Sequence, residues 1–166
     1  MQYMRLDPPS REALLGELAG MPAFLRAAFE GLAAEALARR GPDGAFAPIE
    51  QVWHLADLED EGFGYRIDRL LHASNPTLPD FDGSAVAEAR HYCTLSFAAG
   101  LDKFARARAA NLGTLREIEG EAWSRSGTQE GVGPVMLCDM PLFLAQHDRA
   151  HKAEIGEWLA SQGARR

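Results

Sequence analysis

Apolar residues recur at intervals of three and four along most of this chain, and this spacing constrains the fold more than any other feature of the sequence. Such intervals place apolar side chains on one face of an α-helix. Alternating runs of β-branched residues, which would indicate strands, are nearly absent. The pattern therefore predicts an all-α protein without a sheet of consequence.

Four principal helical stretches are predicted, over residues 10–32, 48–71, 84–119 and 137–160, and a shorter helical stretch through Leu37 follows the first. Ser10 is placed to cap the first stretch, and Pro22 is expected to bend or restart it. Pro48 suits the first turn of the second stretch, because the N–H that proline lacks would have no intrahelical partner there. The third stretch is weakened by glycines and is expected to break near residues 92–96.

Two segments rich in glycine and proline, residues 75–83 and 124–134, show neither a helical nor a strand period. The first is long enough to serve as a crossover connection between helices. With 166 residues, the chain is about the size of one domain. We therefore expect a single domain over residues 1–166, folded as a four-helix bundle with a long crossover connection.

The charge and cysteine content exclude several classes of partner. A formal net charge of −7, from acidic residues scattered along the chain, opposes binding to nucleic acid. The sequence shows neither a leading apolar signal segment nor an apolar run long enough for a membrane span, so no membrane association is expected. Cys93 and Cys138 lie far apart, which favours a reduced, cytoplasmic protein in which both thiols pack as small apolar side chains.

The last helical stretch carries two histidines within its apolar stripe. The stripe consists of Met140, Leu144, His147, His151, Ile155 and Trp158. Histidines at positions i and i+4 point the same way and can share a metal ion, although the spacing also arises by chance and two ligands rarely hold an ion. Asp148 falls off the stripe and is expected to face outward.

A third ligand would have to come from another helix, and three other histidines are available. His72 lies at a helix end and His91 in a poorly periodic stretch, so both are expected at the surface. His54 lies early in a strong helix, flanked by apolar residues. It is roughly opposite that helix's most apolar stripe, however, so periodicity by itself slightly favours a His54 that faces water.

Several segments resemble one known family. The run from Phe46 to Glu59 resembles the entry to the second helix of DinB-like (DinB/YfiT) proteins, and the run from His147 to His151 resembles the histidine pair of their last helix. Further similarity lies at Arg108, Asn111, Leu112, Trp123 and Gly127. The resemblance implies a four-helix bundle in which His54, His147 and His151 hold one divalent metal ion. It also implies thiol-dependent transferase or isomerase chemistry, which the better understood members perform.

Three neutral imidazoles suit Zn, Ni, Fe or Mn as a divalent ion and leave at least one coordination position open. An open position can activate a water or a thiol, so the pattern is compatible with hydrolysis and with thiol transfer. Asp57 and Glu61 follow His54 by one and two turns and are candidate second-shell partners for its imidazole. The alternative is that both belong to a solvated acidic face paired with arginine.

The leading hypothesis is a metal-dependent enzyme, a thiol-dependent S-transferase or hydrolase, acting on a small molecule. A low-molecular-weight thiol is the expected co-substrate, and residues 75–83 and 124–134 could border the mouth of the site. The alternative is a non-catalytic stress-response or binding protein in which a closed metal site fastens the helices together. A bundle without metal is a third reading. Apolar bundle faces of this size also allow a homodimer.

Overall fold

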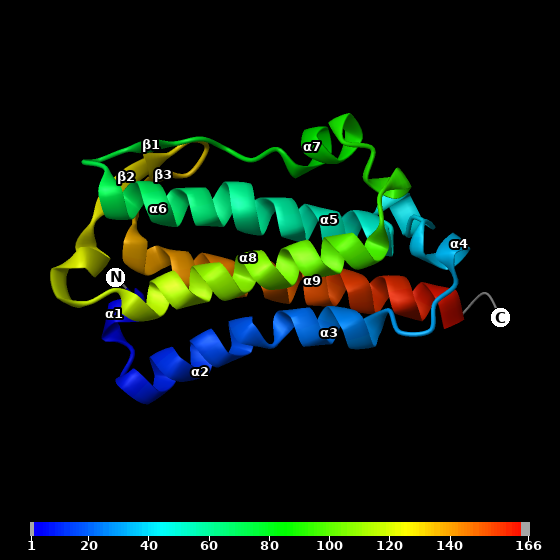
Figure 1. Cartoon of the computed structure of the whole chain (residues 1–166), viewed down its shortest axis with the longest axis horizontal. Helices are drawn as coiled ribbons and strands as arrows, with labels where there is room; N and C mark the ends of the chain where they lie inside the picture. Colours follow the sequence, from blue (N-terminus) through cyan, green and yellow to red (C-terminus); the bar gives the residue numbers. More distant parts are fainter. Residues whose placement is uncertain (1, 164–166) are drawn as a thin grey trace.

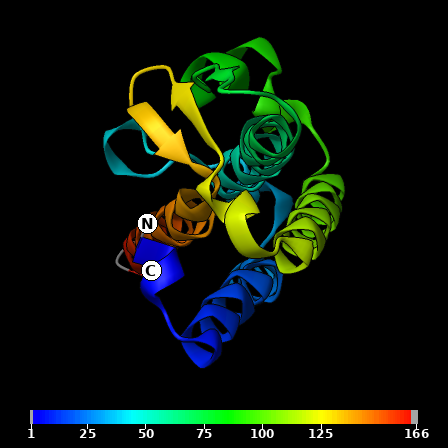
Figure 2. The ribbon, with the colours of Figure 1, turned by 90° about the vertical axis from the view of Figure 1, so that its left-hand side faces the viewer.

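The computed structural model describes residues 2–163, and within them four long helical segments lie side by side (Figure 1). The segments are α2 (Pro8–Ala19) with α3 (Met21–Ala28), α5 (Pro48–Asp57) continued by η2 (Leu58–Gly64) and α6 (Tyr65–His72), α8 (Phe97–Glu117), and α9 (Met140–Gly163). Seen end-on, they form the four columns of a bundle (Figure 2). The predicted four-helix bundle is confirmed. Within the described residues, no helix combines the length and apolar character needed to span a membrane.

Short elements connect these columns. The helical ones are α1 (Gln2–Arg5), α4 (Ala34–Leu37), η1 (Pro42–Gly44), α7 (Gly83–Ala89), η3 (Tyr92–Thr94), η4 (Gly120–Ser124) and η5 (Leu137–Asp139). The break expected at residues 92–96 is thus present as η3, after which Ser96 caps α8. The cap predicted for the first helix was wrong: Asp7 caps α2 by accepting a hydrogen bond from the Ser10 amide at 2.8 Å. Pro22 restarts the helix, as predicted, in the first turn of α3.

The two segments predicted as loops contain a small sheet. Strand β1 (Thr77–Leu78) pairs in parallel with β2 (Ser126–Gln129), and β2 pairs in antiparallel with β3 (Gly133–Met136). Gly127 permits the close approach, because a Cβ atom there would lie 2.7 Å from the backbone oxygen of Pro76. These strands are too short, and too rich in glycine and proline, to show an alternating pattern in the sequence.

Two apolar clusters fill the bundle and are separated by a band of polar side chains. One cluster includes Leu15, Leu18, Phe63, Leu112 and Leu144. The other includes Met21, Leu25, Val52, Phe104 and Ile155. Along α8 the change from one cluster to the other occurs at Arg108, and along α9 it occurs between His147 and His151. The predicted inward stripe of the last helix is confirmed, with its two histidines at the level of this band.

A buried ion cluster forms the centre of the band. The Arg108 guanidinium donates to Asp148 at 2.6 and 2.9 Å, to Glu59 at 2.8 Å and to the Leu18 carbonyl at 2.9 Å. These four residues belong to four different columns of the bundle. The prediction that Asp148 faces outward was wrong. Its carboxylate lies off the apolar stripe, but it is buried against Arg108 rather than exposed to water.

The segment η2 is a π-helix, which contributes about one extra residue to its turn. Asn111 supports this segment by donating to the Glu59 backbone oxygen and to the Glu59 carboxylate, both at 2.8 Å. The extra residue shifts every position after it by about 100° relative to an unbroken α-helix. Phe63 therefore comes closer to the face of His54 than a uniform helical period allows. The apolar stripe predicted for this helix is nevertheless buried throughout, at Val52, Ala56, Phe63, Ile67 and Leu70.

Replacing Arg108 by methionine should destabilise the protein strongly, because Glu59 and Asp148 would remain buried without a cation. We expect the free energy of unfolding to fall by about 3–5 kcal/mol, measured by urea denaturation. The matched control is Arg26→Met, which removes an exposed ion pair with Asp102 and should cost less than about 1 kcal/mol. Equal effects of the two substitutions would show that the buried cluster has no special role.

Candidate metal centre

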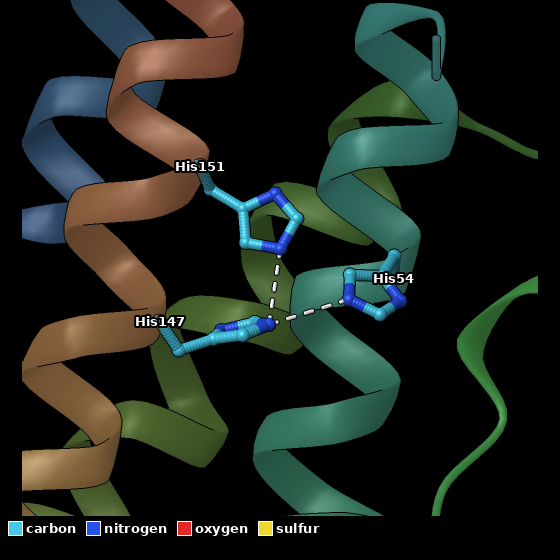
Figure 3. A group of neighbouring side chains, drawn as sticks. All are labelled: His54, His147 and His151. Carbon is cyan, nitrogen blue, oxygen red and sulfur yellow. Dashed lines mark hydrogen bonds between the residues drawn. The ribbon is translucent and has the colours of Figure 1, made fainter. Parts of the chain in front are cut away.

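Three histidines converge from two helices inside the bundle. His54 reaches from α5, and His147 and His151 reach from α9, with their rings directed toward one another (Figure 3). The Nε2 atom of His147 lies 3.4 Å from Nε2 of His54 and 3.0 Å from Nε2 of His151. One ligand atom from each of the three rings lies within 4.8 Å of the others. The structure thus brings together the three residues expected from the resemblance.

His151 is oriented by two side chains that the sequence analysis did not identify. Its Nδ1 lies 2.5 Å from the Oε1 atom of the buried Gln51 and 3.2 Å from a carboxylate oxygen of Glu154. Gln51 in turn donates to Glu154 at 2.9 Å. Because both oxygens can only accept, Nδ1 must carry the proton, and the lone pair of Nε2 faces the other rings. Gln51 precedes His54 by three residues on the same helix face, a spacing that could have identified it.

His54 is covered by the segment that crosses over α5 and by Phe46, which lies just before α5. Its ring contacts Phe46 and Phe81 at centroid distances of 5.7 and 6.3 Å. A Cβ atom at Gly83 would overlap the His54 ring, so the absence of a side chain there leaves room for the imidazole. Periodicity favoured a His54 exposed to water because the cover comes from a distant connection rather than from a neighbouring helix of the bundle.

Burial keeps these imidazoles neutral. Desolvation, followed by the charge of His151, lowers the pKa of His54 to about 4. Desolvation, followed by the charges of His151 and His54, lowers the pKa of His147 to about 2. Desolvation also lowers the pKa of His151, against the opposing influence of Glu154. At neutral pH the site therefore presents unprotonated nitrogen atoms, which is the form that binds a metal ion.

The donor set fits one divalent transition-metal ion. Imidazole nitrogens bound at about 2.0–2.1 Å to a tetrahedral ion lie about 3.4 Å apart, and those of an octahedral ion lie about 3.0 Å apart. The observed Nε2 separations of 3.4 and 3.0 Å lie in the range spanned by these values, and all three ligand atoms lie within 4.8 Å of one another. A hydrogen-bonded second ligand sphere, here Gln51 and Glu154, is typical of metal-binding histidines. His54, His147 and His151 are the residues that would hold the ion.

A cavity of about 380 Å³ adjoins the centre on the side of His147. Phe63 and Arg66 form one wall, Phe143 on α9 forms another, and Gln129 and the tip of the β2–β3 hairpin form the rim. A molecule in this cavity would therefore approach the cluster at His147. The expectation that residues 124–134 border the site agrees with this arrangement, whereas the same expectation for residues 75–83 was wrong for this cavity, since none of them lines it.

Asp57 and Glu61, the candidate second-shell residues, have other partners. Asp57 is buried and accepts hydrogen bonds from Tyr92 and Lys103, both at 2.7 Å, and from Arg90. Glu61 pairs with Arg90 through two hydrogen bonds of 2.7 and 2.8 Å. Within the described part of the chain, neither carboxylate hydrogen-bonds to an imidazole. They instead fasten the segment around η3 to the outer face of α5.

The remaining predicted positions divide between surface and core. His72 and His91 are exposed, as expected. Cys138 is buried among apolar residues, as predicted, but the prediction for Cys93 was wrong because its thiol is exposed. Cys93 is not part of the core because it lies in η3, a short connecting element outside the long helices.

The neutral imidazoles predict a pH-dependent stability of the protein freed of metal. Below pH 6.5 the unfolded chain binds protons at positions 54 and 147 that the folded protein does not, so stability should fall as the pH decreases toward 4. The loss is at most about 1.4 kcal/mol per pH unit for each histidine. Urea denaturation in chelator should show a smaller slope for His147→Gln and an unchanged slope for the exposed His72→Gln. Identical slopes for all three proteins would contradict the burial of neutral imidazoles.

Comparison with known proteins agrees with this geometry. YfiT from Bacillus subtilis has a similar structure, with a TM-score of 0.86, 20% sequence identity, and coverage of 95% of this chain and 90% of that chain. That protein is described as a probable metal-dependent hydrolase with an unusual four-helix bundle topology. At this identity the likeness shows the fold. A search of curated proteins finds no match.

The family model of the DinB superfamily matches residues 17–155. This range contains all three converging histidines, both partners of His151 and the Arg108 ion cluster. The resemblance inferred from the sequence is confirmed over most of the chain. The protein therefore belongs to the DinB superfamily.

Proposed function

We propose that this protein is a metal-dependent enzyme that acts on a small molecule bound beside His147. The observation that carries the proposal is the convergence of three neutral imidazoles at the wall of a cavity of about 380 Å³. Three protein ligands leave a coordination position for a reactant, whereas structural metal sites in proteins are usually closed by four. The cavity is within the size range of small-molecule sites.

The chain's own residues would prepare the centre for chemistry. A divalent ion bound there would supply Lewis acidity and lower the pKa of a coordinated thiol or water. Gln51 fixes the tautomer of His151, and Gly83 leaves the space in which the His54 ring is held. Phe63 and Phe143 contribute apolar surface to the cavity beside His147. These contacts reduce the reorganisation needed when a reactant binds.

We favour thiol transfer over hydrolysis as the reaction at this site. Among the described residues, no carboxylate lines this cavity, so none is placed there as a general acid for an amine or alkoxide leaving group. Transfer of a thiol to an electrophile requires chiefly that the thiol be deprotonated. A low-molecular-weight thiol is therefore the proposed co-substrate. Hydrolysis is the second candidate, because the similar YfiT structure is described as that of a probable metal-dependent hydrolase.

The test compares two substrate panels on protein purified without a histidine tag and loaded with Zn, Ni, Fe or Mn. Monochlorobimane with a set of cellular thiols reports thiol transfer, and a set of esters and amides reports hydrolysis. We expect metal-dependent reaction with at least one thiol and a loss of at least about 100-fold in His147→Ala, because two imidazoles seldom retain the ion. The exposed His72→Ala variant should retain wild-type activity and metal content.

The outcomes separate the alternatives. Metal-dependent cleavage of esters or amides, with no acceleration of any thiol, would replace transfer by hydrolysis. Metal that binds at one ion per chain while neither panel reacts would favour the non-catalytic, metal-stabilised alternative. Absence of stoichiometric metal binding would contradict both enzymatic readings.

A further inference from the structure

The cavity beside His147 contains two buried polar atoms without a partner. Arg66 is 5% exposed, and the Nε atom of its guanidinium has no hydrogen-bond partner among the described residues. Gln129 is 8% exposed, and its Oε1 is likewise unpartnered within that part of the chain. Both residues line the same cavity. Nε of Arg108 and Nδ1 of His54 are also unpartnered within the described residues, but neither of these residues lines the cavity. Because buried polar groups are nearly always hydrogen-bonded, two unpartnered atoms at one cavity are positions that a ligand could complete.

Arg66 differs from the other deeply buried arginine of the bundle. Arg108 is neutralised by two carboxylates, whereas Arg66 donates a hydrogen bond of 3.2 Å to the backbone oxygen of Pro79 and forms no ion pair with a described residue. The nearest acidic influence on Arg66 comes from Asp80, which is exposed, and burial lowers the pKa of the guanidinium. A desolvated cation with so little compensation is costly unless an anion accompanies it.

Arg66 lies near the histidine cluster, with the Phe63 ring between its guanidinium and His147. Its guanidinium carbon lies 5.7 Å from the centre of the Phe63 ring, and that ring lies 6.0 Å from the ring of His147. An anionic group held at Arg66 would thus lay the rest of its molecule across Phe63 toward the metal centre.

We propose that the cavity binds a small carboxylic acid, with its carboxylate on Arg66 and a hydroxyl or N–H group on Gln129. A guanidinium with a free Nε–H presents the fork of donors that matches a carboxylate. The apolar side chains of Phe63 and Phe143 receive the body of the molecule, whose far end faces His147. This inference rests on the proposed function, since it names the substrate class of the same site.

The test measures binding rather than turnover. Isothermal titration calorimetry with carboxylates from butanoate to 3-phenylpropanoate is carried out on metal-free and zinc-loaded protein, beside the neutral analogue 3-phenylpropanamide. We expect saturable binding of at least one carboxylate in both metal states, and at least about tenfold weaker binding of the amide. Arg66→Met should weaken carboxylate binding by at least about tenfold while retaining the zinc content. The control Arg69→Met, an exposed residue of the same helix, should bind as the wild type does.

Arg66→Lys keeps the charge without the fork and should lie between the wild type and Arg66→Met, which keeps the test valid if the methionine variant does not fold. Equal binding of acid and amide, unchanged binding in the Arg66 variants, or no saturable binding of any carboxylate would overturn the inference. Binding that requires zinc and ignores Arg66 would overturn it as well, because the metal would then be the anion's ligand. None of these outcomes depends on activity, so failure of the proposed reaction is distinguishable from failure of the carboxylate site.

Discussion

The guanidinium of Arg108 is the point at which all four columns of the bundle meet. It neutralises Glu59 and Asp148 away from water and also binds the Leu18 carbonyl. Removing Arg108 would leave two buried carboxylates without a cation, and the guanidinium can reach its partners only when the helices are placed as they are, so the cluster favours a single relative placement of the helices. Asp148 directly follows His147 on α9. An inward Asp148 therefore fixes the rotation of α9, and with it the direction in which both of its histidines point.

The histidine cluster and the cavity depend on this arrangement in different ways. The π-helical η2 carries Glu59 to Arg108 and brings Phe63 toward His147, so one irregular turn serves both the ion cluster and the cavity wall. The histidines lie between the two apolar clusters, where desolvation keeps them neutral. The rim of the cavity is formed by the β2–β3 hairpin, outside the helical columns. A rigid centre is thus combined with a border whose side chains can select the ligand.

The spacing of apolar residues predicted those features that depend on residues close together in the sequence. The helices, the break before α8 and the inward histidine pair of α9 follow from residues that neighbour one another on a helix. Asp148, Gln51 and Arg66 acquire their environment from segments far away in the sequence, so no window of the chain predicts their burial. The sheet escaped prediction because β1 and β2 stabilise each other across about 50 residues. Placing His54 at the cluster required the family resemblance, because its cover comes from the crossover segment.

The claim that three histidines hold one metal ion is tested most directly by X-ray absorption at the zinc edge of protein loaded with zinc and purified without a histidine tag. The predicted spectrum contains three imidazole nitrogens at about 2.0–2.1 Å and at least one further light atom from a non-protein ligand. Multiple scattering from the imidazole rings counts those ligands independently of any activity. Sulfur in the first coordination sphere, or fewer than three imidazoles, would contradict the claim.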